Sequence, residues 1–244
     1  CFISSRRAYH EHLKGESLPP ATAREKELFH RYRPFIRNGE DYLLLHDLIA
    51  RGVEVHVQED LDREIASRGR ETMDRYGRLF YRAREEFLRE DREFWLELNP
   101  LFPGMGEILE KVLGHPKFYI LSTKKAEFIL EILAHHRIPW REDRVIFSGP
   151  RPKGEVIRDL LSREGGGEAV FVDDQLDHLL TAGKMGGIRT YLASWGYVKP
   201  RWLENGEVPA LDREGLAELV EPFRFPAPPD SRRLSGEGGI PWER

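Results

Sequence analysis

The stretch "EAVFVDDQLDHLLTAGKMGGIRTYLA", residues 168–193, contains a complete strand–helix–strand unit. "EAVFV" and "IRTYLA" are short apolar runs, and the segment between them predicts a helix that ends at a glycine pair. Two strands joined by a helix pair in parallel. Neither run alternates with polar residues, which is typical of strands covered on both faces. The stretch therefore predicts a buried parallel sheet.

The same alternation extends over residues 99–220. "KFYIL" predicts a strand that ends at Ser122, and "RVIFS" predicts another. Helices are expected over residues 124–136, in "KGEVIRDLLSRE" and in the closing "DREGLAELVEPF". We predict the α/β class, with a doubly wound, Rossmann-like parallel sheet.

Residues 24–98 have a different character, because they are rich in Arg and Glu and have helical periodicity. "DYLLLHDLIARG" places apolar residues on one stripe and stops at Gly52. No strand is expected between Glu59 and Leu98. This half therefore predicts a small helical bundle.

Composition excludes several classes of protein. The 244 residues include 42 acidic and 38 basic side chains, for a net charge of -4, which argues against a general nucleic-acid or membrane-surface binder. Cys1 is the single cysteine, so no internal disulfide can form. The apolar runs are too short to span a membrane. We expect a cytoplasmic protein, monomeric or homodimeric.

The residues just after each strand matter most, because ligands of doubly wound sheets bind beyond the carboxyl ends of the strands. Each such residue alone has an ordinary interpretation, as a helix cap or a solvated lysine. Two adjacent acids at Asp173 and Asp174 exceed what capping needs, and a buried carboxylate is costly without a compensating cation. A divalent cation with oxygen ligands, Mg²⁺, is the natural solution.

Hydroxyl groups, backbone amides and amines on the same rim are typical of a phosphate site. Together with a metal, they indicate phosphoryl transfer. The expected phosphate-binding residues are Ser122, Thr123, Lys124 and Lys153, with Asp173 and Asp174 as metal ligands.

These residues resemble the haloacid-dehalogenase-like (HAD) hydrolases. "FYILSTKK" is similar to the second motif of that family, "PRPKGEVI" to the third and "VFVDD" to the fourth, in the family's order. The resemblance covers about residues 99–220. It implies that Ser122 and Lys153 are catalytic, that Mg²⁺ is the cofactor and that the substrate is a small phosphorylated metabolite. It also implies the following domains: the start of the core over 1–14, a helical cap over 15–98 and the α/β core over 99–224. Residues 225–244 are rich in Pro, Gly, Ser and charged residues, which predicts a disordered or loosely docked tail.

The family's first motif, an Asp-x-Asp that supplies the nucleophile and the general acid/base, has no match before Leu13. We expect it to lie upstream of Cys1, with residues 1–13 forming the helix after it, and the chain without it to be inactive. The implied reaction is phosphomonoester hydrolysis through an aspartyl-phosphate. The alternatives are a non-catalytic relative that binds a phosphorylated ligand or a protein, and a dehalogenase or phosphonatase. The aspartate pair favours the phosphatase over the dehalogenase.

Three further residues are candidates for the site. Arg33 and Arg37, in the helical segment, are candidates to hold an anionic substrate, although surface ion pairing is the commoner role of such arginines. Asp177 is a further acidic candidate, one helical turn after the pair, where simple exposure is the alternative. No glycine-rich dinucleotide or P-loop motif follows a strand, and no Ser-His-Asp order is apparent.

Overall fold

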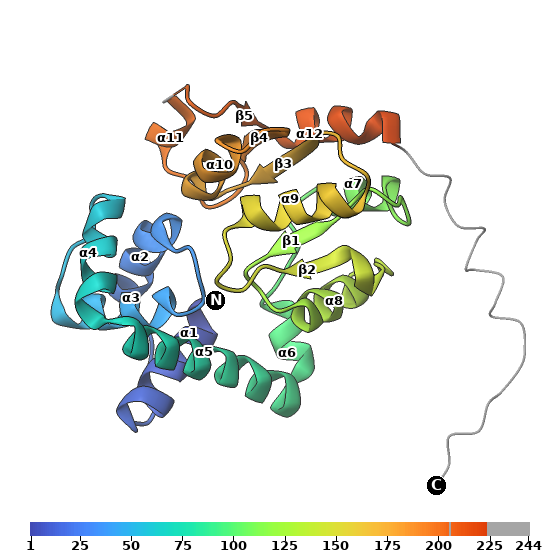
Figure 1. The fold of residues 1–244 in the computed structure, drawn as a ribbon. Coiled ribbons are helices and arrows are strands. Elements are labelled where there is room, and N and C mark those ends of the chain that lie inside the picture. Colours follow the sequence, from blue (N-terminus) through green and yellow to red (C-terminus); the bar gives the residue numbers. More distant parts are fainter. Residues whose placement is uncertain (205, 224–244) are drawn as a thin grey trace, which may run out of the picture.

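Parallel strands and covering helices form the carboxyl-terminal half of the protein (Figure 1). The computed structural model describes residues 1–204 and 206–223, and within them the strands pair only in parallel. The apolar runs of the sequence predict four of these strands. The fifth, β5, has two residues, too few for a pattern. The strands are β1 (Ile120–Ser122), β2 (Val145–Phe147), β3 (Ala169–Asp173), β4 (Ile188–Ala193) and β5 (Ala210–Leu211).

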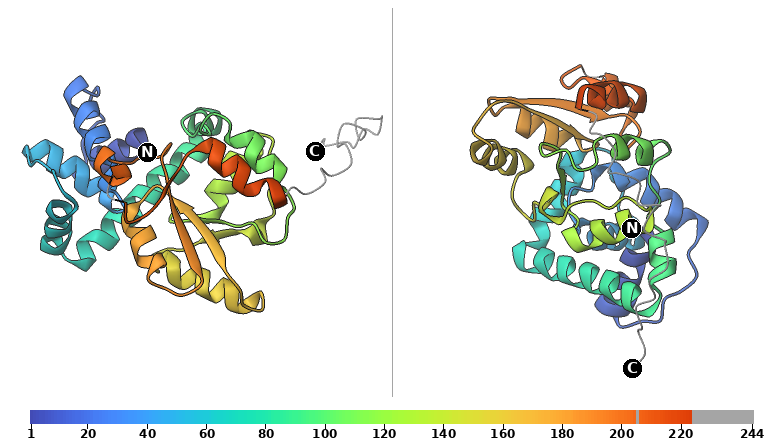
Figure 2. Two further views of the ribbon diagram at one scale, coloured as in Figure 1. Left: turned by 90° about the horizontal axis from the view of Figure 1, so that it is seen from above. Right: turned by 90° about the vertical axis from the view of Figure 1, so that its right-hand side faces the viewer.

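Helices connect successive strands, as parallel pairing requires. Helix α8 packs against β2, α10 against both β3 and β4, and α12 against α7 (Figure 2). The doubly wound α/β class is confirmed, although α11 was not predicted. The helices of this half are α7 (Met105–Lys111), α8 (Ala126–His135), α9 (Lys153–Arg163), α10 (Leu176–Gly183), α11 (Pro200–Glu204) and α12 (Arg213–Val220).

The strands divide into two sheets rather than one. β1 pairs with β2, and β3 pairs with β4, which pairs with β5. In the described part of the chain, no strand joins β1 to β3. An apolar groove of about 400 Å³ has lining residues from both sides, including Leu121 before the end of β1 and Phe171 in β3. Each sheet therefore has a free edge at this groove.

The amino-terminal half is helical, as predicted. Thr22 caps α2 by accepting from the Glu25 N–H (3.1 Å), and Gly52 ends α3 in the left-handed conformation. The predicted first helix is α1 followed by a π-helical segment, η1. The elements are α1 (Phe2–Arg7), η1 (Ala8–Lys14), α2 (Ala23–Tyr32), α3 (Asp41–Arg51), α4 (Gln58–Arg68), α5 (Arg70–Glu90) and α6 (Arg92–Glu97).

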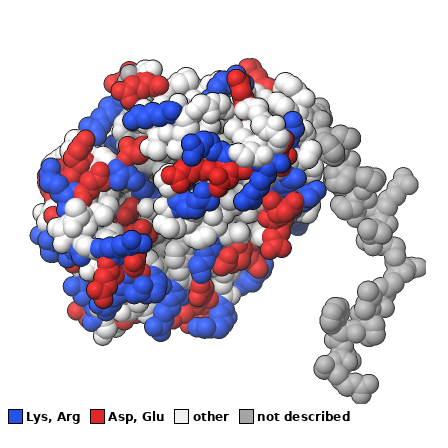
Figure 3. Space-filling model, viewed as in Figure 1, with Lys and Arg blue, Asp and Glu red and all other residues white. Residues whose placement is uncertain are grey.

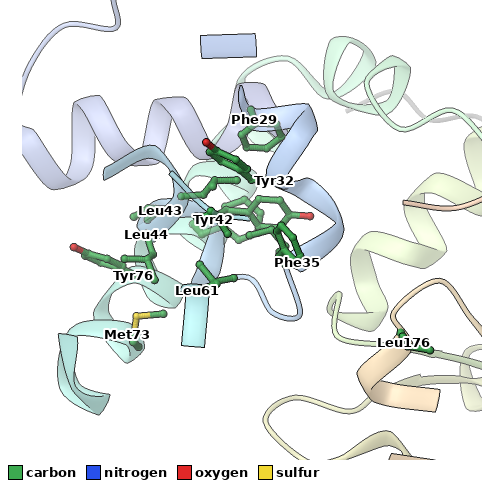
Figure 4. Close-up of a cluster of buried hydrophobic side chains, with 14 of the residues drawn as sticks. Phe29, Tyr32, Phe35, Tyr42, Leu43, Leu44, Leu61, Met73, Tyr76 and Leu176 are labelled. Atoms are coloured by element: carbon green, nitrogen blue, oxygen red, sulfur yellow. The ribbon is translucent and has the colours of Figure 1, made fainter. Parts of the chain in front are cut away.

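The largest apolar core joins this helical cap to the strands. Its centre lies among the aromatic and leucine side chains of α2, α3 and α5 (Figure 4), and it continues to Leu176 and Leu192 of the α/β half. Phe35 of the cap meets Trp202 of α11 edge to face. Shared burial of this kind fixes the cap on the core through the hydrophobic effect. The four domain boundaries stay predictions, and the predicted tail over 225–244 lies outside the described residues.

No helix in the described ranges combines the length and the apolar character needed to cross a bilayer.

Candidate functional site

Ser122, Thr123 and Lys124 form the turn that follows β1. The Lys124 N–H donates to Ser122 Oγ (3.0 Å), which leaves the Ser122 hydroxyl proton for another acceptor. Thr123 donates to the carbonyl of Arg37 (3.4 Å), and the Tyr81 hydroxyl donates to the Thr123 carbonyl (2.7 Å). The cap therefore holds this turn in place through two hydrogen bonds.

Lys124 lies in a strongly cationic environment. Its ammonium donates to Asn99 Oδ1 (3.1 Å). Burial and the nearby guanidinium groups of Arg84 and Arg33 lower the pKa of Lys124 to about 7. An anion bound here would restore its charge.

Lys153 opens α9 and forms an ion pair with Asp173 at the end of β3. Both side chains are under 10% exposed. Asp173 also accepts from the Gln175 N–H (2.8 Å), and its carboxylate lies 3.5 Å from His178 Nδ1. Burial alone would raise the pKa of Asp173, but the charge of Lys153 and the contact with His178 lower it to about 2. The carboxylate is therefore charged at neutral pH.

Asp174 turns to a different partner. Its carboxylate accepts from the Tyr197 N–H (2.9 Å) in the loop after β4. A side chain at Gly196 would overlap Asp174, so the loop can approach this closely only with glycine at that position. The two adjacent aspartates therefore differ: Asp173 has an ammonium partner, and Asp174 has a backbone amide.

Asp177 and Arg37 pair with each other rather than standing free. Arg37 Nε donates to Asp177 Oδ2 (2.8 Å), and its terminal nitrogen donates to Asp62 Oδ1 (2.6 Å). Gln175 adds a second link across the same boundary by donating to the carbonyls of Pro34 (3.1 Å) and Ile36. Two carboxylates pair with the guanidinium of Arg37, which is the commoner role of such arginines, and its role toward an anionic substrate stays a prediction. These ion pairs join the cap to the core.

A cavity of about 440 Å³ lies between the cap and the end of β1. It brings the Ser122–Lys124 turn together with Arg33 from the cap. Lys153, Asp173 and Asp174 do not line it, but Tyr197 both lines it and donates to Asp174. The predicted residues therefore form two neighbouring groups joined by Tyr197.

Two cavity residues were missed in the sequence. Arg84 is a charged residue on the apolar stripe of α5, four positions after Phe80, and that placement was the available signal. Tyr197 lies in a loop without a pattern, so nothing in the sequence distinguishes it.

The cap also contains a Ser–His–Glu chain that the sequence order did not indicate. Ser5 Oγ lies 2.8 Å from His46 Nε2, and His46 Nδ1 lies 3.5 Å from Glu25. Ser5 is completely buried and His46 is 3% exposed, so no substrate can reach them. Arg6 completes the network by pairing with Glu25 (2.7 Å). This hydrogen-bonded network of side chains links α1, α2 and α3.

Comparison with solved structures supports the fold. One similar structure, from Lactobacillus delbrueckii subsp. bulgaricus, is named provisionally as a phosphoglycolate phosphatase; it matches 91% of this chain and 90% of its own, with 12% identity and a TM-score of 0.52. Another, a predicted phosphatase from Clostridium acetobutylicum, matches 90% of each chain at 11% identity and a TM-score of 0.49. No family model matches, and a search of curated proteins finds no match. The first of these structures supports the doubly wound α/β fold with a helical cap.

Proposed function

We propose that the protein is a Mg²⁺-dependent phosphatase that hydrolyses a small phosphomonoester. The observation that supports this most directly is the buried Lys153–Asp173 pair beside Asp174 at the end of β3. It holds one charged carboxylate and one amine at a strand end, where doubly wound folds bind ligands. For stability alone, a buried ion pair is often no better than apolar residues of similar size, so its presence at a strand end favours a role in binding a charged ligand.

The chemistry of the carboxylates fits a magnesium ion. Mg²⁺ takes oxygen ligands and commonly uses one or two carboxylates together with water and phosphate oxygens. Asp173 and Asp174 supply two carboxylates, and Asp173 is charged at neutral pH. Within residues 1–204 and 206–223, no group of three or more His, Cys, Asp or Glu side chains is arranged around a metal position. When bound, Mg²⁺ would neutralise charge on the transferred phosphoryl group.

The other residues have distinct roles in the proposal. Ser122 donates its free hydroxyl proton to a phosphoryl oxygen, and Thr123 and Lys124 bind the same phosphate from the adjoining turn. Lys153 holds Asp173 in its charged form and balances the negative charge of the phosphate. The cap excludes water from the site when substrate is bound.

Hydrolysis through an aspartyl-phosphate also needs a nucleophile. We propose that this carboxylate lies on a strand in the groove between β1 and β3, where two free strand edges face each other. Its oxygen attacks phosphorus, and the alcohol leaves with a proton from a second carboxylate. Water then attacks the acyl phosphate, releasing inorganic phosphate and regenerating the carboxylate.

Hydrolysis of p-nitrophenyl phosphate tests this proposal, measured on residues 1–244 and on the full reading frame that contains them. We expect turnover in the full reading frame to require Mg²⁺ and to fall at least 100-fold in Asp174→Asn. Asp159→Asn, on the exposed face of α9, is the matched control. Activity that survives both EDTA and Asp174→Asn would refute the metal assignment. Binding of phosphate esters without any turnover would favour the non-catalytic alternative.

A further inference from the structure

The cavity between the cap and the end of β1 has an unusual charge distribution. Four cationic side chains line it: Arg33, Arg37 and Arg84 from the cap and Lys124 from the core. Arg37 is paired with Asp62 and Asp177. None of the other three, Arg33, Arg84 and Lys124, forms an ion pair with an Asp or Glu of the described residues. Elsewhere in the structure, arginines are commonly paired, and Figure 3 shows Lys and Arg interspersed with Asp and Glu on the viewed face. The cavity therefore stands apart from the paired surface.

Arg84 is the most buried of the three, at 4% exposure. Its guanidinium lies 4.2 Å from the centre of the Phe80 ring, and among the described residues it donates only to Cys1 Sγ (3.4 Å), a weak acceptor. Burial and the charge of Arg33 lower the pKa of Arg84. A buried guanidinium without a carboxylate is costly to the fold.

Arg33 reaches the same cavity from the end of α2. Its guanidinium lies 4.2 Å from the ring centre of Tyr197 and 5.3 Å from that of Tyr42. Its Nε is buried and has no hydrogen-bond partner among the described residues. Stacking on aromatic faces fixes the plane of the guanidinium and leaves its hydrogen-bond donors free. Arg33 is therefore oriented for an acceptor that the described chain does not supply.

We infer that this cavity binds a second anionic group of the substrate. The inference rests on the proposed function: the phosphoryl group lies at the Ser122–Lys124 turn, and a carboxylate or second phosphate on the same short molecule reaches Arg33 and Arg84. Guanidinium groups bind both kinds of anion through paired hydrogen bonds. The substrate class is accordingly a small phosphomonoester with an additional acidic group, and Arg33 and Arg84 determine this specificity.

The charge balance supports the assignment. Lys124 has a pKa of about 7 without ligand, as a result of burial and of the repulsion from Arg84 and Arg33. An anion between the three groups would remove that repulsion and favour the charged amine. Because the cavity of about 440 Å³ is large enough for several heavy atoms beyond one phosphate, the second group fits without displacing the cap.

Calorimetric titration with matched probes tests the inference. Phosphoglycolate and ethyl phosphate have the same chain length and differ in the carboxylate; methylenediphosphonate carries a second phosphonate, and malonate carries two carboxylates without phosphate. We expect wild-type protein to bind phosphoglycolate at least 10-fold more tightly than ethyl phosphate. Tighter binding of phosphoglycolate than of methylenediphosphonate would indicate that the second group of the substrate is a carboxylate, and the reverse order of affinities would indicate a second phosphate.

Arg84→Met should reduce this preference to under 3-fold and leave the affinity for ethyl phosphate within 3-fold of wild type. Arg33→Gln should have the same effect, and Arg84→Lys should retain part of the preference. The exposed Arg75→Met, on the same helix, is the control and should change nothing. Arg84→Met should also raise the melting temperature of the ligand-free protein, because it removes an uncompensated buried charge.

The outcomes separate this inference from the phosphatase proposal. Equal binding of ethyl phosphate and phosphoglycolate would overturn the inference alone, as would a preference that survives Arg84→Met. Malonate binding that depends on Arg84, with no binding of any phosphate probe, would support the anion cavity and overturn the phosphatase proposal. Absence of binding for every probe would overturn both.

Discussion

The Lys153–Asp173 pair allows a quantitative prediction about stability. The pKa of Asp173 falls from 3.8 to about 2 on folding, a shift of roughly two units, which corresponds to about 2.5 kcal/mol of stabilisation. Lys153→Met would leave the buried carboxylate without its cation, and loss of one partner of a buried pair costs about 3–5 kcal/mol. Asp173→Asn should have a similar effect, because it leaves the ammonium of Lys153 buried and unpaired.

The double variant Lys153→Met/Asp173→Asn separates the pair from its surroundings. Since neither charge remains, we expect the double variant to lose less stability than either single variant, so that the coupling energy exceeds the loss of one single variant, about 3–5 kcal/mol. Urea unfolding followed by circular dichroism at pH 7 measures all four proteins. The control is Lys125→Met, which breaks a more exposed pair with Glu85 (2.7 Å) and should cost less than about 1 kcal/mol.

The stability that the charged Asp173 contributes should depend on pH in a defined direction. Because the folded pKa of Asp173 lies below its unfolded value, the stabilisation is fully present above about pH 4 and is lost as the pH falls toward 2. The difference between wild type and Lys153→Met should therefore shrink in that range. Additive losses in the double variant, or a difference that is constant from pH 7 to pH 2, would refute the pairing.

Three further predictions concern other parts of the structure. Gly196→Ala should cost about 1–3 kcal/mol in urea unfolding, because the new methyl group overlaps Asp174, whereas Gly106→Ala, with open space around it, should be neutral or slightly stabilising. Burial and the neighbouring Asp41 raise the pKa of Glu40 to about 7, so the free energy of unfolding should fall as the pH rises from 4.5 through 7. Glu40→Gln should remove this pH dependence and should be more stable than wild type by about 2 kcal/mol at pH 8. Ser5→Ala should lower stability by about 1–3 kcal/mol and leave phosphatase turnover unchanged; lost turnover with unchanged stability would contradict the structural role of that network.

Most of the secondary structure could be predicted because each strand is a local apolar run. β3 and β4 were predicted from "EAVFV" and "IRTYLA", and the structure places them at Ala169–Asp173 and Ile188–Ala193. The division into two sheets could not be predicted, because strand pairing depends on contacts between segments far apart in the chain. Within residues 1–204 and 206–223, nothing local indicates which strand edges stay free.

The site was predictable only where its residues follow strands. Ser122 and Asp173 could be nominated because strand ends are visible in the sequence, and their roles in the site stay predictions. The partnership of Arg37 with Asp177 spans 140 positions, so it could not be read from either neighbourhood. Arg84 differs from the other arginines of α5 only in its place on the apolar stripe, four positions after Phe80.

Charge compensation is therefore a better guide to this site than residue type. Arg37 was as good a candidate as Arg33 in the sequence, since both are cap arginines in one polar stretch. The structure gives Arg37 two carboxylates and gives Arg33 aromatic rings with an unsatisfied Nε. A buried arginine that already has acidic partners stabilises the fold, whereas one without them is stabilised by a ligand. By that criterion Arg37 joins the cap to the core, and Arg33 and Arg84 are the residues that we propose select the substrate.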